Sequence, residues 1–415
     1  QMHITIHRGI NQIGGCITEI STATSRIFID MGDNLPGNGK EMSEEEKAAF
    51  VGSLFQVTDK EVAVFYTHYH GDHVGLSQYV PKGIQQYIGK VAKQVMLVKT
   101  KVLNGNIDQI NAYKTYDVAK AITIGDIVVK PFLVSHSACD AYMFLVEADG
   151  KKILHSGDYR DHGYIGKGIK AFVPQYIGQV DYLITEGTML SRTSEKVLTE
   201  GELRCQAHRL MKDNKYNFVI CSSTDIDRLA TFYNARPKGY LFVCDTYQAE
   251  VLNVFTRENG TRADLYKFTD IDAFPDNTLL GRMLAQGFCM LVRPNDKSKS
   301  NYNRFTEMAI SSCNKNKQVF YSMWHGYIQP NTEHTNESYV QFLEHFDKTQ
   351  IQMLHTSGHA SPSCIKELIE MVNPREGIIG VHKEGGTSLT TLDLSDDLKR
   401  KIIPENKQTD CVAIR

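Results

Sequence analysis

At 415 residues the chain is too long for one ordinary domain, so two domains are expected, and 41% hydrophobic residues suffice for sizeable cores. The formal net charge of −2 neither supports nor excludes a nucleic-acid partner, because only a local basic groove would be needed. No run of about twenty apolar residues exists, so no membrane span is expected. The N-terminus lacks the pattern of a secretion signal. The nine Cys form no C-x-x-C pair and are interpreted as reduced core residues of a cytoplasmic protein.

The first predicted elements are strands. Residues 4–6 and 16–20 alternate between apolar and polar types, and Gly14 and Gly15 between them predict a turn. The apolar run at residues 62–66 predicts a buried strand. The carboxyl end of such a strand is where open α/β sheets place their ligands.

Directly after this strand, residues 67–73 read THYHGDH, which is the densest group of metal-binding side chains in the chain. The potential ligands are His68, His70, Asp72 and His73. Imidazole and carboxylate together suit zinc or another divalent transition metal, and this set exceeds what one tetrahedral ion needs from a single loop. The spacing therefore predicts two ions side by side.

Two later apolar runs also end at a potential ligand beside small residues. Residues 131–134 lead into Ser-His-Ser, which contains His136, and residues 152–154 lead into His-Ser-Gly-Asp, which contains Asp158. Taken singly, His136 is as often a core histidine as a ligand, and Asp158 is more often a turn residue than a ligand. Together with the first cluster, both are predicted to be ligands.

These residues and their order resemble the metallo-β-lactamase superfamily of two-metal hydrolases. The resemblance implies that one ion is held by His68, His70 and His136, the other by Asp72 and His73, and that Asp158 bridges both. Residues 27–32 resemble the third strand of that superfamily, whose Asp lies under the metal loop. Asp30 is therefore either a partner that orients a metal ligand or an ordinary residue at the end of a strand.

The chain changes character after Ser191. Residues 181–185 predict another core strand, but residues 203–211 have helical periodicity, and strands are predicted at 218–221 and around 240–244. Alternating helices and strands predict a separate parallel α/β layer. We therefore expect a domain at residues 191–350, inserted between the first part (1–190) and the returning part (351–415) of the other domain.

Two segments of the inserted domain suggest contact with nucleic acid, although a structural role is favoured for each. Residues 295–317 are basic, with Tyr302 and Phe305 interleaved, and a solvated loop is favoured over a nucleic-acid channel. The basic residues are Lys297, Lys299, Arg304, Lys315 and Lys317. Trp324, the only Trp, could stack on a base, but a core position is favoured.

The returning part combines a strand, a loop and a helix. Residues 351–354 predict a strand that ends in His-Thr-Ser-Gly-His-Ala, and Ser361 and Pro362 predict the start of a helix that Asn373 and Pro374 end. The backbone N–H groups at such a helix start are unpaired and suit an anion. The predicted substrate is therefore a phosphate ester.

Three late motifs make the resemblance more specific. Thr-Glu-Gly-Thr at 185–188, the His-Thr-Ser-Gly-His-Ala loop at 355–360 and Val-His-Lys-Glu at 381–384 resemble motifs A, B and C of the β-CASP branch, in the order found in bacterial ribonuclease J. This branch inserts a cap domain into the metallo-β-lactamase fold and cuts nucleic acids. The resemblance implies a four-layer αβ/βα sandwich with an inserted α/β cap. It also implies that Glu186 and His359 are the motif A acid and motif B histidine, and that His382 completes the second metal site.

The function implied by this resemblance is two-metal hydrolysis of single-stranded RNA by a metal-bridging hydroxide, with endonuclease and 5′-exonuclease modes both open. The cofactors would be two zinc ions, with manganese as an alternative. A DNA nuclease of the same branch and a small-molecule ester or thioester hydrolase are the other candidates. The catalytic residues would be Asp72, Glu186 and His359, and the substrate-binding residues Ser357, Gly358, His359 and Ala360. Ribonuclease J proteins usually carry a C-terminal dimerisation domain, which is not expected here, and a homodimer stays open.

Overall fold

The computed structural model of the protein describes residues 2–56, 59–260, 263–276, 278–295, 301–313, 315–404 and 411–413. The chain divides into two units. The first comprises Gln1–Thr100, Gly105–Glu195 and Gly358–Arg415, and the second comprises Lys101–Asn104 and Lys196–Ser357. The segment that follows Ser357 therefore returns to the first unit.

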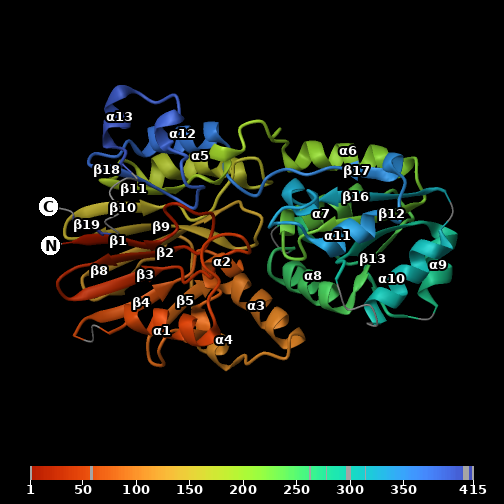
Figure 1. The fold of residues 1–415 in the computed structure, drawn as a ribbon, viewed down its shortest axis with the longest axis horizontal. Coiled ribbons are helices and arrows are strands. Elements are labelled where there is room, and N and C mark those ends of the chain that lie inside the picture. Colours follow the sequence, from red (N-terminus) through yellow and green to blue (C-terminus); the bar gives the residue numbers. More distant parts are fainter. Residues whose placement is uncertain are drawn as a thin grey trace. The chain divides into compact units, whose positions relative to one another are not determined.

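The first unit contains two β-sheets (Figure 1). One has seven strands in the order β19-β1-β2-β3-β4-β5-β6, and the other has six in the order β18-β11-β10-β9-β8-β7. The strands of the first sheet are β1 (His3–Arg8), β2 (Ile17–Ser21), β3 (Ser25–Ile29), β4 (Glu61–Phe65), β5 (Gln85–Gly89), β6 (Lys114–Tyr116) and β19 (Cys411–Ala413). Those of the second are β7 (Ile122–Ile124), β8 (Ile127–Val134), β9 (Ala141–Ala148), β10 (Lys151–His155), β11 (Tyr182–Glu186) and β18 (Gly377–Val381).

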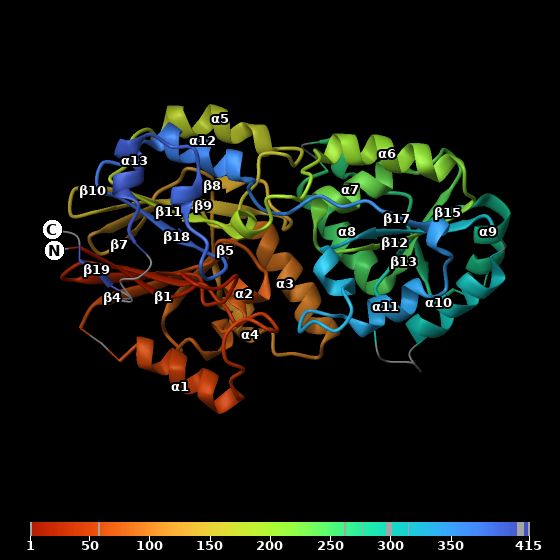
Figure 2. The same cartoon turned by 45° about the horizontal axis from the view of Figure 1, so that its top comes forward.

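The core of this unit has two layers. Between the sheets, side chains from both, such as Ile27 and Phe65 from the first and Phe144 and Ile184 from the second, form one buried cluster. A second cluster packs the other face of the six-stranded sheet against three helices (Figure 2). These helices are α5 (Ile169–Phe172), α12 (Pro362–Val372) and α13 (Asp396–Lys401).

Helices also lie on the outer face of the seven-stranded sheet. Phe28 of β3 is fully buried and packs against Phe55, which ends α1 (Glu44–Leu54), with ring centroids 4.8 Å apart. The remaining helices of this part of the chain are α2 (Gly71–Val74), α3 (Lys90–Val102) and α4 (Asp108–Ala112). Helices therefore cover both outer faces of two stacked sheets, which confirms the αβ/βα sandwich predicted from the sequence.

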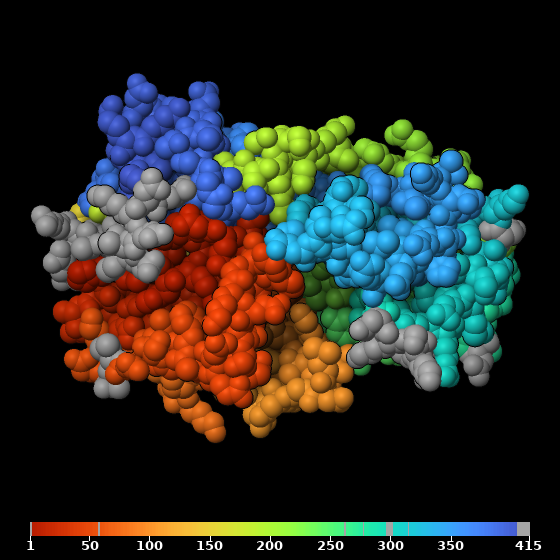
Figure 3. Space-filling model, in the orientation of Figure 1, coloured from red at the N-terminus to blue at the C-terminus, as the bar shows by residue number. Residues whose placement is uncertain are grey.

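Segments from the two ends of the chain lie side by side in this unit. The N–H of His382, just after β18, donates to the carbonyl of Gly9 at 2.7 Å, and the Lys383 N–H donates to the carbonyl of Gln12 at 3.2 Å. In the space-filling view, N-terminal atoms in red adjoin C-terminal atoms in blue on the face shown (Figure 3). The returning segment thus brings His382 beside the first strands.

The second unit is an α/β layer built on a six-stranded sheet of order β14-β13-β15-β12-β16-β17, in which every pairing is parallel. All six residues of β12 are buried, as expected for a parallel strand covered on both faces. The strands are β12 (Tyr216–Cys221), β13 (Leu241–Asp245), β14 (Asp272–Phe274), β15 (Phe288–Val292), β16 (Lys317–Ser322) and β17 (Ile351–Met353). The helices are α6 (Glu200–Lys212), α7 (Ile226–Ala235), α8 (Thr246–Glu258), α9 (Leu279–Gln286), α10 (Asn301–Ser312) and α11 (Glu337–Leu343).

The aromatic side chains of the basic segment lie in the core of this unit, whereas Trp324 does not. Phe305 of α10 is buried and stacks on Phe274 of β14 at 4.6 Å, and Tyr302 packs against the same core, so these aromatic side chains do not line a channel. Lys297 and Lys299 of the same basic segment lie outside the described residues. The core position favoured for Trp324 is wrong: the side chain is only half-buried and packs edge-on against Tyr327 and His334.

Among the described residues, no helix combines the length and the apolar character needed to cross a membrane. Between residues 16 and 364, the described Cys side chains carry free thiols, and most of these thiols are buried. The buried ones are Cys16, Cys139, Cys221, Cys244, Cys289 and Cys364.

Candidate metal centre

Three histidine nitrogens converge at the end of β4. His70 Nδ1 lies 3.1 Å from His68 Nε2 and 3.3 Å from His136 Nε2. Two nitrogens that each lie about 2.0–2.1 Å from a tetrahedral zinc are roughly 3.3 Å apart. Both distances are therefore those of ligands that share one ion, and the ligand atoms of all three histidines lie within 4.8 Å of one another.

Hydrogen bonds hold two of these rings in the form that a metal requires. The Nδ1 of His136 lies 2.6 Å from the carbonyl oxygen of Gly358 and must donate to it, which leaves the Nε2 lone pair for an ion. The Thr67 hydroxyl donates to Asp30 and lies 2.9 Å from His68 Nδ1, so it accepts from that nitrogen. Burial lowers the pKa of each of the three histidines, that of His70 to about 4. The rings are therefore neutral, as metal ligands must be.

Beside these nitrogens, four further atoms form a second group of the kind that could hold an ion. His73 Nε2 lies 3.1 Å from Asp158 Oδ2 and 3.6 Å from Asp72 Oδ2. His382 Nε2 lies 3.1 Å from Asp72 Oδ2 and 3.4 Å from Asp158 Oδ2. Two imidazoles and two carboxylates thus surround one point, in a mixture of ligand types that suits zinc and its neighbours.

Asp158 lies between the two groups. Its Oδ2, which is 3.1 Å from His73 Nε2 in the second group, is also 3.7 Å from His136 Nε2 and 3.9 Å from His68 Nε2 in the first. Burial opposes ionisation of the carboxyl, but His382 and His73 hold its pKa well below the usual range. An ionised oxygen shared by both groups is placed where a bridging ligand would lie.

The second group of ligand atoms carries more negative charge than the first. Burial opposes protonation of His73 and His382, but Asp158 and Asp72 outweigh it and raise the pKa of both rings. The pair of carboxylates therefore attracts a cation to this point. His73 Nε2 is buried and makes no hydrogen bond, although Asp158 Oδ2 lies 3.1 Å away, and an ion between these two atoms would satisfy both. The donor set thus fits a divalent metal.

Residues outside the ligand sets orient the second group. Asp30 Oδ2 lies 2.7 Å from His73 Nδ1, and the same carboxylate accepts from the Thr67 N–H and hydroxyl. Of the two interpretations of Asp30, the structure therefore favours the orienting partner. Thr188 Oγ1 lies 2.7 Å from His382 Nδ1, and His382 adopts a positive φ of 50°, a backbone conformation that few residues other than Gly adopt.

His359 and Glu186 form a separate pair next to the metal ligands. His359 Nδ1 lies 3.0 Å from Glu186 Oε2, and Glu186 Oε1 accepts from the backbone N–H of Tyr159 at 3.0 Å and of Ala360 at 3.4 Å. The Ala360 N–H, expected to hold a phosphate, thus donates to Glu186 in this structure, and its contact with a phosphate stays a prediction. Ser357 is the last residue of the second unit and is buried.

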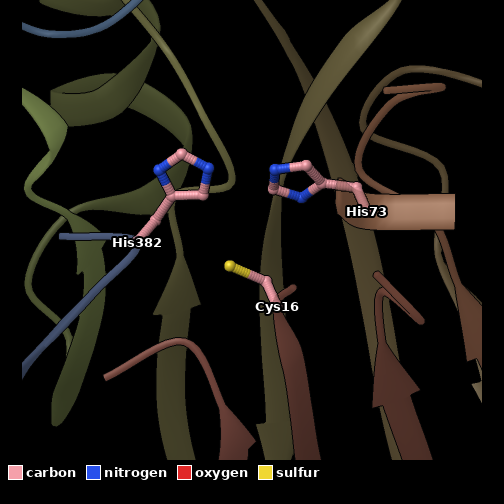
Figure 4. Close-up of side chains that lie close together, drawn as sticks. All are labelled: Cys16, His73 and His382. Atoms are coloured by element: carbon pink, nitrogen blue, oxygen red, sulfur yellow. The ribbon is translucent and has the colours of Figure 1, made fainter. Parts of the chain in front are cut away.

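One residue of the centre was missed by the sequence analysis. Cys16 precedes β2, and one potential ligand atom from each of Cys16, His73 and His382 lies within 4.8 Å of the others (Figure 4). The thiol has 5% residue exposure, and burial raises its pKa well above the usual value. The only signal for Cys16 in the sequence was its position directly after Gly14 and Gly15. This signal is weak, because no spacing rule connects residue 16 to residues 73 and 382.

Comparison with known proteins places the chain near ribonuclease J. No protein-family model matches it. It is 27% identical over 161 residues to ribonuclease J of Helicobacter pylori (strain ATCC 700392 / 26695), covering 38% of this chain and 23% of that protein. It is 22% identical over 409 residues to ribonuclease J of Mycoplasma genitalium, covering 91% of this chain and 67% of that protein. An RNase J-like protein of Methanocaldococcus jannaschii is 27% identical over 202 residues, 45% of this chain and 42% of that protein.

The chain spans about a quarter of the length of the Helicobacter relative and two thirds of that from Mycoplasma genitalium. A crystal structure of a protein of unknown function from Enterococcus faecalis V583 covers 100% of both chains with a TM-score of 0.75 and 19% identity, which shows a shared fold. The resemblance to ribonuclease J that the motifs indicated is therefore confirmed by relatives from several species.

Proposed function

We propose that this protein is a two-metal hydrolase that cleaves phosphodiester bonds of single-stranded RNA. The observation that carries the proposal is the pair of ligand groups that share Asp158 Oδ2. Two-metal sites of this kind serve phosphatases and nucleases, in which a pair of ions clamps the attacking and the leaving oxygen. The relatives named ribonuclease J support RNA as the substrate.

The first ion would be held by His68, His70 and His136, and the second by Asp72, His73 and His382, with Asp158 between them. Zinc suits these donors best, and manganese is the alternative. When bound, the ions would supply an activated water and would screen the charge of the phosphate. Asp72 would serve the reaction by helping to hold the second ion.

His359 is the residue that we assign to the phosphate. Glu186 keeps a proton on His359 Nδ1, since a carboxylate 3.0 Å away accepts only from an N–H. His359 Nε2 is then the atom that can reach a phosphate oxygen, and Glu186 stabilises the positive charge if that nitrogen carries a proton. Glu186 is therefore a positioning residue, and its own place is set by the N–H groups of Tyr159 and Ala360.

The second unit would be the β-CASP cap that the motifs predicted. Its boundaries, after Glu195 and after Ser357, differ by a few residues from the expected 191–350. The His-Thr-Ser-Gly-His-Ala loop crosses the second boundary.

The test combines metal analysis with cleavage of single-stranded RNA and DNA of one sequence, each with a 5′-monophosphate. We expect two divalent ions per chain and cleavage of RNA in preference to DNA. The Asp158→Ala variant should lose cleavage, whereas Asp117→Ala, which changes an exposed carboxylate of the same unit, should keep it. Protein that holds two ions but cleaves neither strand would overturn the substrate class. Equal or faster cleavage of DNA would favour the DNA nuclease.

A further inference from the structure

Cys16 is held in a defined position beneath the second group of ligands. Gly14 and Gly15 have positive φ angles of 79° and 65°, and their turn leads the chain directly into β2. The Cys16 N–H donates to the carbonyl of Asp72 at 3.1 Å, and the Cys16 carbonyl accepts from the Gly32 N–H at 3.0 Å. The backbone of Cys16 is therefore tied to the metal loop on one side and to the segment after β3 on the other.

The thiol points toward the two histidines of this group. Figure 4 shows the sulfur directed at the space between the rings of His73 and His382, which come from different parts of the chain. The potential ligand atoms of the three residues all lie within 4.8 Å of one another. Independently, His73 Nε2 is buried and makes no hydrogen bond, although Asp158 Oδ2 lies 3.1 Å away. Three donors thus surround one point.

We propose that Cys16 Sγ is a further ligand of the ion held by Asp72, His73, His382 and Asp158. This inference rests on the proposed two-metal function, because it adds a ligand to one of those two ions. As the sulfur–metal bond forms, the S–H bond breaks and its proton passes to solvent. Binding of the second ion should therefore release one more proton in the wild-type protein than in a variant without this thiol.

A thiolate at this point has a physical advantage. Two divalent ions bring more positive charge into a buried site than the carboxylates of Asp72 and Asp158 balance, and unbalanced buried charge is costly. A thiolate from Cys16 reduces the excess. It also makes the two sites different, because the first offers imidazole nitrogens and the shared carboxylate, whereas the second gains a soft ligand that favours zinc over manganese.

The test is cobalt substitution. Protein stripped with a chelator is titrated with Co²⁺ to two equivalents, and the absorption spectrum is recorded. A thiolate ligand produces an intense sulfur-to-cobalt band in the near ultraviolet, which nitrogen and oxygen ligands do not produce. We expect this band to develop with one of the two equivalents. We also expect it to disappear in Cys16→Ser and to persist in Cys289→Ala, which removes a buried thiol of the second unit.

X-ray absorption of the zinc-loaded wild-type protein provides a measurement that needs no variant. A sulfur scatterer at about 2.3 Å from zinc, beside nitrogen and oxygen at about 2.0–2.2 Å, is the expected result. The affinity for the second zinc should fall at least about tenfold in Cys16→Ser, the lower end of what the loss of an outer-shell partner costs.

The outcomes separate the two proposals. Two bound ions without the absorption band or the sulfur scatterer would overturn the role of Cys16 and leave the two-metal function standing. A band that persists in Cys16→Ser would likewise overturn it. Failure of the wild-type protein to bind two ions would overturn the proposed function itself.

Discussion

Replacing Gly358 with Ala should disable the first metal site through a single methyl group. A Cβ at this position would lie 2.2 Å from Ser137 Oγ and 2.5 Å from Ser137 Cβ, whereas ordinary contacts begin near 3.4 Å. The two loops must therefore separate by about 1 Å, and a close-packed interior does not absorb such a change freely. Gly358 is also the residue whose carbonyl accepts from His136 Nδ1 at 2.6 Å.

The size of the effect follows from this hydrogen bond. When the Gly358 carbonyl moves away, His136 loses the acceptor that sets its orientation and tautomer. Loss of such a partner costs about 10–100-fold in metal affinity. A misplacement of about 1 Å near the reacting groups costs on the order of 100-fold in turnover. We expect Gly358→Ala to bind the first ion 10–100-fold more weakly and to cleave RNA about 100-fold more slowly.

The assay measures metal content by elemental analysis and turnover on labelled single-stranded RNA. Gly168→Ala is the control, since Gly168 has a helical φ of −58° and no atom near an added Cβ. The double variant Ser137→Gly, Gly358→Ala removes the opposing side chain and should recover both quantities. Wild-type metal content and turnover in Gly358→Ala would refute the reasoning, and failure of the double variant to recover would show that the clash is not the cause.

Three further predictions concern other residues of the first unit. Asp158→Ala should lower metal content and turnover more than any other single ligand change, and a variant with both metals and near-normal turnover would show that Asp158 is no bridge. His359→Ala should keep both ions but lose on the order of 10²–10³-fold in turnover. Glu186→Gln should alter the pH profile of turnover. Loss of metal in His359→Ala would instead make His359 a metal ligand. Although burial opposes it, hydrogen bonds from His7 and Arg26 hold the pKa of Glu19 at about 2. The carboxylate therefore contributes about 3 kcal/mol to the free energy of unfolding, a contribution that is present above pH 4.5 and lost as the pH falls toward 2. Glu19→Gln should lower the free energy of unfolding at pH 7 and make it depend less on pH in acid, as measured by urea titrations.

Much of the local structure was determined by the sequence alone. The ligands from His68 to His73 follow an apolar strand within one loop, so their proximity needs no long-range contact. The same holds for Ser361 and Pro362, because the Ser361 side chain accepts from the Cys364 N–H at the start of α12 as the capping pattern predicts. Such features depend on neighbours in the chain, and backbone geometry places these at fixed distances.

Other parts of the centre were decided by the tertiary structure. Cys16 meets His73 and His382 only because β2 and β3 pair in the first sheet and because the chain returns from the second unit to β18. The bonds from Ala360 to Glu186 and from His136 to Gly358 likewise join residues far apart in the chain. Strand order and sheet stacking bring these residues together, and local periodicity carries no record of which distant segments will pair. The sequence therefore determined which kinds of ligand the site would use, whereas the fold decided which residues surround and orient them.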